Sequence, residues 1–200
     1  MSRRKKADAS LEANRRDELL QMATRLFVAK GFEATTTRDI ADAVGMCPGS
    51  PFYHFRSKHD LLKAAMIAGI DSGLQRLQTA VAGIADPERR LRTMIRTHLG
   101  TLLESECPAS LLFYESRSLA SDAHAEITAA TDRYQQLWQA TLDELAAGGR
   151  LRGPAKATRL LLFGMLNWCS QWYRPDGALS LDTIADLAAT MVLVDSAMEE

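Results

Sequence analysis

The stretch from Thr35 to Leu62, TTTRDIADAVGMCPGSPFYHFRSKHDLL, decides how the N-terminal part of this chain folds. Thr36 and Asp39 have the spacing of a capping box, with Asp in place of the usual Glu or Gln, so a helix is predicted to begin at Thr36. Gly45 supplies a residue that readily adopts the left-handed conformation in which helices commonly end. A shorter helix is predicted beyond it, from about Pro48 to Phe55. Two helices joined by a tight glycine turn are therefore expected here.

A longer helix is predicted ahead of this pair, from about Arg15 to Lys30. Leu19, Met22 and Leu26 recur at the spacing of a helix face that is buried against a core. Gly31 follows Lys30, where a helix-ending residue is expected. A supporting helix followed by a helix, a glycine turn and a short helix is the layout of a helix-turn-helix domain. Such domains place the second helix of the pair in the major groove of DNA.

The side chains around the short helix suit contact with DNA. Gly49 has no side chain to hold the backbone away from phosphates, and Ser50 is short and can donate or accept a hydrogen bond. Tyr53 and His54 carry polar tips on aromatic bodies, whereas Phe55 is expected to pack in the core of the small domain. A purely structural role in that core is the alternative for the aromatic residues of this helix. The residues predicted to contact DNA are Thr36, Thr37, Arg38, Pro48, Gly49, Ser50, Tyr53, His54 and Lys58.

This part of the chain resembles the DNA-binding domain of the TetR family of bacterial regulators. The resemblance rests on a set of residues at fixed spacing: Phe27, Gly31, Thr36, Ile40, Ala41, Gly45, Gly49, His54, Phe55, Lys58, Leu61 and Leu62. It implies a DNA-binding regulator of transcription. It also implies that a variable helical C-terminal domain dimerises and holds a small-molecule effector.

Three positions depart from the pattern of that family. Cys47 stands where relatives often have Ser or Thr before the recognition helix, and Cys is a poorer cap. Pro51 and Phe52 replace a Leu-Tyr pair, and Pro51 lies in the first turn, where a helix tolerates Pro. Phe52 lacks the hydroxyl that contacts phosphate in relatives, so Tyr53 is expected to make that contact instead. These departures concern how bases are read and do not affect the presence of the domain.

The whole chain is predicted to be all-α, with about nine helices, because turn signals separate long segments of helical period. Residues 1–12 are expected to form a disordered basic arm, residues 13–62 a three-helix helix-turn-helix domain, and residues 63–200 a larger helical domain for ligand binding and dimerisation. Residues 1–63 carry 12 Lys and Arg against 8 Asp and Glu, a net charge of +4, whereas residues 64–200 carry 12 against 17, a net charge of −5. A basic small domain joined to an acidic larger one fits a DNA-binding regulator.

Turn signals also predict where the later helices begin and end. A fourth helix is expected from about Lys58 to Ile84, and Asp86-Pro87 opens a fifth. Cys107-Pro108 precedes a sixth helix, and a seventh covers about Ala123 to Ala147. Gly153-Pro154 opens an eighth helix, and Ser180 caps a ninth.

The last two helices are predicted to form a dimer interface. Each has a continuous apolar stripe, and two such helices from each subunit would form a symmetric four-helix interface. The predicted interface comprises Leu161, Gly164, Trp168, Ile184, Leu187, Ala188, Met191 and Val194. The alternative is that these stripes pack inside one chain, and the resemblance to the TetR family favours the dimer.

Aromatic side chains with polar groups mark a candidate ligand pocket in the C-terminal domain. Pockets for small molecules are mostly apolar, with a few polar groups that orient the ligand. The candidate ligand-binding residues are Tyr114, Arg117, Tyr134, Trp138, Met165, Trp168 and Trp172. For each of them an ordinary place in the core or on the surface is an open alternative. His98, on an apolar stripe, is predicted to be a hydrogen-bonded core histidine rather than a ligand-binding residue or a switch.

The segment from Trp172 to Leu179, WYRPDGAL, is similar to a subgroup of the TetR family. Members of that subgroup repress genes of lipid and steroid catabolism and release DNA on binding an acyl-CoA thioester. The resemblance implies a homodimer on a palindromic operator and an effector of this kind, with Arg117, Arg133 and Arg174 as candidate partners for its phosphates. A regulator of drug efflux or of another catabolic gene, with a different effector, is the alternative. The Pro-Gly core of the segment also has a plain structural interpretation as a helix stop and turn.

Other classes of function lack support in the sequence. No phosphate loop, catalytic Ser-His-Asp arrangement or helical Glu/His pairing is recognisable, so neither an enzyme, a cofactor nor a bound metal is expected. A protein-binding adaptor would leave the basic N-terminus and the cluster from Gly49 to Lys58 unexplained. Cys47, Cys107 and Cys169 are far apart and are expected to be free thiols. No apolar run is long enough to span a membrane, and the N-terminus lacks the apolar core of a signal peptide, so the protein is expected in the cytoplasm.

Overall fold

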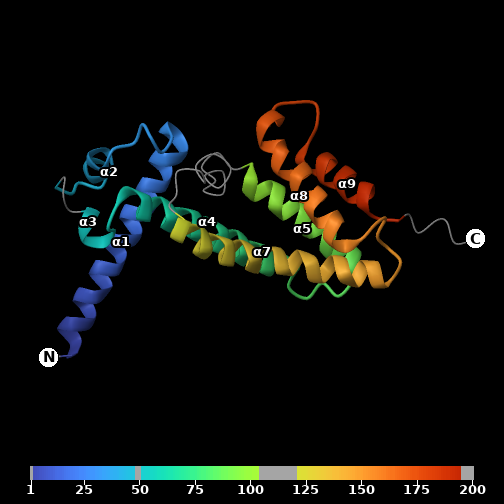
Figure 1. Ribbon diagram of the computed structural model, residues 1–200, viewed down its shortest axis with the longest axis horizontal. Helices are drawn as coiled ribbons and strands as arrows, with labels where there is room; N and C mark the ends of the chain where they lie inside the picture. Colours follow the sequence, from blue (N-terminus) through green and yellow to red (C-terminus); the bar gives the residue numbers. More distant parts are fainter. Residues whose placement is uncertain (1, 48–50, 104–120, 195–200) are drawn as a thin grey trace, which may run out of the picture. The chain divides into compact units, whose positions relative to one another are not determined.

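The computed structural model describes residues 2–47, 51–103 and 121–194 of the chain, and they form eight α-helices (Figure 1). The helices are α1 (Ser2–Lys30), α2 (Thr37–Ala43), α3 (Pro51–His54), α4 (Lys58–Val81), α5 (Pro87–Leu102), α7 (Ser121–Ala147), α8 (Ala155–Trp172) and α9 (Leu181–Val192). The all-α prediction is confirmed for these residues. The helix expected after Cys107-Pro108 lies outside them.

Local chemistry sets the helix ends where the sequence indicated. Gly31 follows α1 directly and Gly45 follows Val44, the C-cap of α2, and both adopt positive φ, 85° and 67°. Asp86 caps α5, because its Oδ2 accepts the backbone N–H of Arg89 at 2.8 Å. Ser180 caps α9 in the same way, with its Oγ accepting the N–H of Thr183 at 3.1 Å. These ends confirm the predicted starts of the fifth and ninth helices.

The beginning of the chain differs from the expectation. α1 starts at Ser2, so residues 2–12 are helical and not the disordered arm that was predicted. The segment is rich in Ala, Lys and Arg and contains no Gly or Pro, so its intrinsic helix propensity is high. The basic composition of the arm suggested a solvated tail, but a charged segment of strong helix formers can extend a neighbouring helix.

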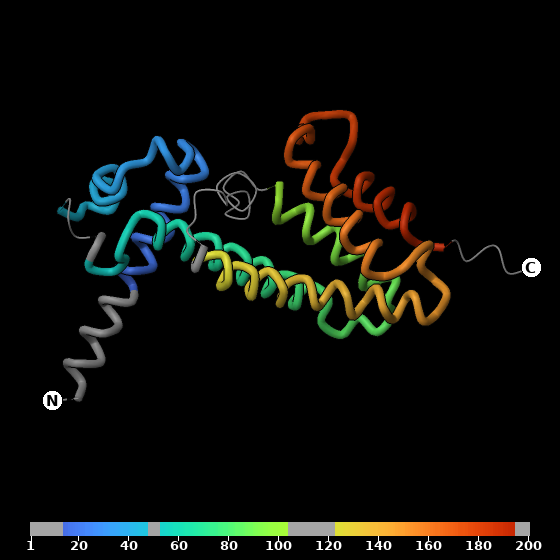
Figure 2. The backbone as a smooth tube through the Cα atoms, viewed as in Figure 1, coloured from blue at the N-terminus to red at the C-terminus, as the bar shows by residue number. Residues whose placement is uncertain are grey.

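The chain forms two compact units, and their boundary differs from the predicted one at residues 62 and 63. The N-terminal unit comprises the described residues up to Ile70 together with the start of α7 up to Thr128. The C-terminal unit comprises the remaining described residues, from Asp71 and from Ala129 onward. Helices α4 and α7 (backbone in Figure 2) each contribute to both units, and each supplies buried apolar residues to both cores.

The core of the N-terminal unit joins the helix-turn-helix to the beginnings of α4 and α7. Phe27 and Phe32 pack with ring centroids 5.3 Å apart, and both are almost fully buried. Lys63 of α4 and Glu126 of α7 form an ion pair of 2.8 Å at the edge of this core. The buried core residues are Leu19, Ala23, Phe27, Phe32, Ile40, Phe55, Leu61, Leu62, Ala65, Met66 and Ala123. The core position predicted for Phe55 is confirmed.

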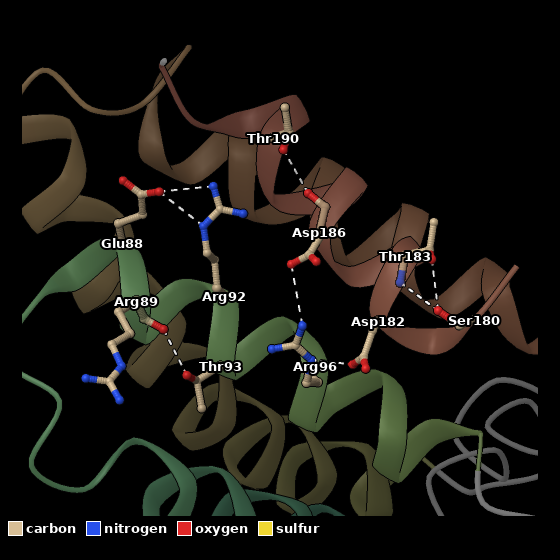
Figure 3. Close-up of polar contacts among 10 residues, drawn as sticks. All are labelled: Glu88, Arg89, Arg92, Thr93, Arg96, Ser180, Asp182, Thr183, Asp186 and Thr190. Carbon is tan, nitrogen blue, oxygen red and sulfur yellow. Dashed lines mark hydrogen bonds and ion pairs between the residues drawn. The ribbon is translucent and has the colours of Figure 1, made fainter. Parts of the chain in front are cut away.

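The core of the C-terminal unit is formed by α5, α7, α8, α9 and the last part of α4. Leu77, Leu91, Trp138, Leu162 and Leu166 are among its fully buried members. On the surface, Arg96 of α5 pairs with two carboxylates of α9, Asp182 at 2.5 Å and Asp186 at 3.5 Å (Figure 3). Such exposed pairs stabilise a fold by at most about 1 kcal/mol each, so the apolar core holds these helices together.

None of the described helices combines the length and the apolarity needed to cross a membrane. Among these residues, no three His, Cys, Asp or Glu side chains gather closely enough to hold a metal ion.

Candidate DNA-binding and ligand-binding sites

The start of α2 is closed by a complete capping box. Thr36 Oγ1 accepts the N–H of Asp39 at 3.1 Å, and Asp39 Oδ2 accepts the N–H of Thr36 at 2.7 Å. These hydrogen bonds from the Thr36 backbone and hydroxyl lower the pKa of the Asp39 carboxyl, with a smaller contribution from Lys30. The arrangement gives Thr36 a structural role. Thr36 and Arg38 are exposed and Thr37 is half-buried, so a phosphate contact stays a prediction for all three.

The recognition segment follows Gly45, whose positive φ lets the chain turn sharply after α2. Pro48, Gly49 and Ser50 lie outside the described residues. In α3, Tyr53 is 93% exposed, which is incompatible with a core role for its ring. His54 ends the helix and is half-buried. The structure therefore separates Tyr53, which faces solvent, from the buried Phe55.

Lys58, the first residue of α4, is held by an aromatic ring that the sequence analysis did not single out. Its ammonium nitrogen lies 4.1 Å from the centroid of the Phe32 ring, and the His59 ring packs edge-on against the same Phe32 at 5.0 Å. A cation over an aromatic face is attracted by the ring quadrupole. Phe32 thus fixes the position of the charge at the start of α4.

Two further contacts fix the connection between α3 and α4. The guanidinium of Arg16 lies 4.7 Å from the centroid of the Phe55 ring, so α1 holds the residue that follows α3. Ser57 Oγ accepts the N–H of Asp60 at 3.1 Å and caps α4. Arg56, between them, is exposed. Its charge and position beside the recognition helix make it a further candidate for phosphate contact, and it is not among the residues that the sequence predicts to contact DNA.

A cluster of five side chains from three helices places polar groups among the apolar residues of the C-terminal unit. His98 of α5 lies between Tyr134 of α7 and Asn167 of α8: Nδ1 is 2.8 Å from the Tyr134 hydroxyl, and Nε2 is 3.0 Å from Asn167 Oδ1. The rings of Trp138 and Phe163 meet the His98 ring edge-on, with centroids 5.7 and 5.4 Å away. The prediction that His98 is a hydrogen-bonded core histidine is confirmed.

The partners of His98 determine its protonation. The amide oxygen of Asn167 can only accept, so Nε2 carries the proton, and Nδ1 accepts from the hydroxyl of Tyr134. Burial lowers the pKa of His98 from 6.5 to about 4, and this outweighs the opposite effect of the Asn167 hydrogen bond. The imidazole is therefore neutral near neutral pH, and both of its nitrogens are used.

Trp138 is the residue of this cluster with an unmet hydrogen-bonding group. Its side chain is fully buried, and its indole Nε1 has no protein acceptor within hydrogen-bond distance. A buried donor without an acceptor costs about 1–3 kcal/mol, so such groups are rare and call for an explanation.

The last two helices expose large apolar side chains. On α8, Leu161 is 75% and Trp168 66% exposed, and on α9, Leu187 and Met191 are each 57% exposed. These residues recur at helical spacing, so they form apolar faces rather than scattered positions. Apolar faces of this kind mark interaction surfaces in soluble proteins.

Comparison with known proteins decides the family. Residues 85–195 match the family described as "Tetracyclin repressor-like, C-terminal domain", and residues 19–65 match "Bacterial regulatory proteins, tetR family". The chain belongs to the tetR family of bacterial regulatory proteins. Its place is therefore among regulators of transcription that contain a DNA-binding helix-turn-helix, and not among enzymes.

The similar proteins include curated regulators and solved structures. The "HTH-type transcriptional repressor KstR2" of Rhodococcus jostii is 29% identical over 191 residues, which cover 93% of either chain. The structure of AibR in complex with isovaleryl coenzyme A and operator DNA is 27% identical and has a TM-score of 0.79. The match covers 88% of this chain and 97% of AibR. A structure titled superantigen pfit is 37% identical with a TM-score of 0.78, over 90% of this chain and 89% of that one.

The predicted ligand-binding residues of this tetR-family chain fall into four groups. Tyr134 and Trp138 meet in the cluster around His98, whereas Tyr114 and Arg117 lie outside the described residues. Met165 is half-buried and packs at the edge of the C-terminal core. The remaining candidates, Trp168 and Trp172, are 66% and 43% exposed, which fits a subunit interface better than an enclosed pocket. Phe163 and Asn167 join the cluster from α8, and no signal in the sequence indicated either of them.

The predicted interface residues also divide. Leu161, Gly164, Trp168, Leu187 and Met191 are exposed, as an interface requires of a single subunit. Ile184 and Ala188 are instead buried in the core of their own chain, so we leave them out of the interface. The N–H of Val194 donates to the carbonyl of Arg150 at 3.0 Å, beside the short bridge between Leu151 and Leu193. Val194 is therefore tied to its own subunit.

Proposed function

We propose that this tetR-family regulator is a dimeric repressor that binds a palindromic operator and is released from it by an acyl-CoA thioester or a related effector. The observation that carries the proposal is the arrangement of α2, the Gly45 turn and α3, which leaves Tyr53 almost fully exposed, five residues before Lys58 at the start of α4. An exposed polar aromatic residue and a cation at the ends of a recognition helix suit contact with base edges and phosphates.

Dimerisation is supported by the exposed apolar faces of α8 and α9. A two-fold interface places the same face of both subunits in contact, so Leu161 and Leu187 would each meet equivalent surfaces of the partner. Two subunits arranged in this way would present two copies of α3. Recognition helices about 34–36 Å apart fit successive major grooves on one side of the duplex, which is why a palindromic operator is expected.

The effector class is supported by the relatives and by the composition of the C-terminal core. AibR was solved with isovaleryl coenzyme A and operator DNA together, and KstR2 is described as a transcriptional repressor. In this chain the cluster of His98, Tyr134, Trp138 and Phe163 combines apolar rings with a few polar groups. This is the composition expected of a site that holds an acyl group.

A structural link from the cluster to α4 suggests how binding would be transmitted. A Cβ atom placed on Gly73 of α4 would lie 3.5 Å from Cε2 of Tyr134, so the tyrosine ring rests against this helix. Movement of Tyr134 on ligand binding would therefore bear on α4, which also contributes Leu61 and Leu62 to the core under the helix-turn-helix. The effector would release DNA only to the extent that it prefers the state with low DNA affinity.

The purified full chain tests the proposal through binding to duplex fragments from the region upstream of its own gene. We expect one fragment to bind as a dimer complex, with an affinity that falls linearly on a log–log plot against salt concentration. Isovaleryl coenzyme A and longer acyl-CoA thioesters should release it, whereas free coenzyme A should not. A monomeric protein, or one that binds no duplex at low salt, overturns the proposal. A bound fragment that no thioester releases removes the acyl-CoA part alone.

A further inference from the structure

The indole N–H of Trp138 is the feature of the C-terminal unit that the packing of the chain leaves unexplained. We infer that this N–H recognises an uncharged carbonyl oxygen of the effector, such as that of a thioester, ester or ketone. The inference rests on the proposed ligand-sensing function and deepens it, because it assigns the atom that reads the ligand and the chemical group that is read. Three observations support it in turn.

The first observation is that Trp138 holds the spare donor of the cluster. Both nitrogens of His98 are occupied, one by Tyr134 and the other by Asn167. Two side-chain atoms in the described part of the chain are buried without a partner, Trp138 Nε1 and Arg150 Nε. The guanidinium of Arg150 still pairs with Glu88 through another nitrogen, whereas indole has a single polar atom. A donor with one hydrogen and no acceptor is suited to one acceptor on a ligand.

The second observation concerns charge. Among the described residues, the ring and hydrogen-bond partners of Trp138 and His98 are Tyr134, Phe163 and Asn167, and none of them is charged. Arg133, next to Tyr134 in sequence, is paired with Asp71 at 2.9 Å on the surface. Placing a carboxylate among uncharged groups is costly because no cation replaces its hydration. The site therefore selects a neutral carbonyl group and disfavours the free acid.

The third observation is access. Trp138 itself is fully buried, but His98, Tyr134 and Phe163 are each only partly buried. The residues packed around the indole are thus partly accessible to solvent, and a ligand would reach the indole edge only if a ring such as that of Phe163 on α8 rotated away. The apolar rings of Tyr134 and Phe163, with centroids 6.2 Å apart, would then flank the acyl chain.

The experiment uses three small probes that carry no coenzyme A. The S-ethyl thioester of isovaleric acid has the carbonyl, ethyl isoamyl sulfide has a methylene group in its place, and isovalerate is the free acid. The full-length protein is labelled with nitrogen-15 at tryptophan, and the Trp138→Phe variant identifies the Trp138 indole signal among those of the three Trp residues. Titration of each probe gives its affinity and the shift of each indole resonance.

We expect the thioester to move the Trp138 signal downfield and to bind about tenfold more tightly than the sulfide, because one buried donor gains its acceptor. Isovalerate should not move this signal. In Trp138→Phe the thioester should lose its advantage while the sulfide binds as in the wild type. The unchanged sulfide affinity serves as the control for folding, since a damaged core would weaken both probes.

Equal affinity of the two neutral probes for the wild type overturns the inference, as does a Trp138 signal that no probe moves, because the N–H would then be satisfied by a buried water. Release of operator DNA by isovaleryl coenzyme A separates this outcome from failure of the proposed function. If release occurs and is unchanged in Trp138→Phe, the proposed function stands and the role of Trp138 is wrong. If no thioester releases DNA, the proposed effector class is wrong. The role of Trp138 is then decided by the affinities and indole shifts of the three small probes.

Discussion

Tyr134 and His98 are joined by a hydrogen bond of 2.8 Å in which the phenol donates to the imidazole Nδ1. The bond requires a neutral imidazole, because a protonated His98 would carry hydrogens on both nitrogens and could no longer accept. It also connects α7 to α5 at the point where Trp138 and Phe163 meet the same ring. The protonation of a single histidine therefore affects the contacts among three helices of the C-terminal unit.

The first prediction is a loss of stability in mild acid. Burial holds the pKa of His98 at about 4 in the folded protein, whereas an unfolded histidine titrates near 6.5. Between these values the unfolded chain binds the extra proton, so the free energy of unfolding is highest above pH 6.5 and falls as the pH drops toward 4, by at most about 3 kcal/mol. Urea unfolding monitored by tryptophan fluorescence, which reports on the C-terminal unit, measures the loss.

The His98→Gln variant isolates this contribution. It should remove most of the pH dependence between pH 6.5 and pH 4, with carboxylates supplying what remains. If the variant does not fold, the titration of the His98 ring protons in the wild type gives the pKa directly. A ring that titrates near 6.5 contradicts the argument, because burial would then have no effect on its protonation.

The second prediction concerns the charge at the start of α4. Lys58→Ala should weaken binding to operator and to unrelated DNA alike and should reduce the slope of log affinity against log salt by about one. Its ammonium group is held over Phe32 and so needs little ordering to meet a phosphate. Fluorescence anisotropy across a salt series measures both affinity and slope.

Lys156 offers a matched control for that substitution. It is exposed on α8 in the C-terminal unit, and Lys156→Ala makes the same change in net charge. It should leave the salt slope unaltered. Equal slopes for the wild type and Lys58→Ala would show that Lys58 makes no phosphate contact, and we would then assign the cation role to Arg56.

The third prediction concerns the exposed apolar faces. Leu161→Glu or Leu187→Glu should weaken self-association by at least about tenfold, because each places a charge at a residue expected in the centre of the interface. Sedimentation equilibrium over a range of concentrations gives the dissociation constants. Ala140→Glu, at an exposed position of α7, should associate like the wild type. If neither Leu substitution weakens the dimer, the dimer interface lies elsewhere on the protein, and the exposed faces of α8 and α9 bind another partner.

Features that depend on local chemistry could be predicted from the sequence. Gly31, Asp86 and Ser180 mark helix ends because a positive φ or a side-chain cap requires only the neighbouring residues. The hydrogen-bonded state of His98 could also be predicted, because a polar ring on an apolar stripe must find partners. The identity of those partners could not, since Tyr134 and Asn167 are distant in sequence.

Features that depend on which surface covers a helix could not be predicted. Periodicity places Ile184, Leu187, Ala188 and Met191 on one stripe, but the structure buries Ile184 and Ala188 and exposes the other two. The apolar periodicity shows which residues share one face of a helix. How much of that face is buried within the same chain depends on where the neighbouring helices lie. The domain boundary has the same explanation. Helix α4 continues from one core into the other without a break, although Gly69 and Gly73 flank Ile70, so no turn marks the change.

The last prediction compares a glycine in a turn with a glycine inside a helix, each replaced by Ala. Gly45 has φ of 67° and nothing within 4 Å of an added Cβ, so Gly45→Ala should cost about 1 kcal/mol through backbone strain alone. Gly100 lies within α5, also with open space around an added Cβ, so Gly100→Ala should stabilise the protein by up to about 1 kcal/mol through helix propensity. Circular dichroism during urea unfolding reports on both units. If both substitutions change the free energy of unfolding in the same direction, the argument is wrong. If Gly45→Ala also weakens operator binding, the conformation of the turn affects how α3 is held.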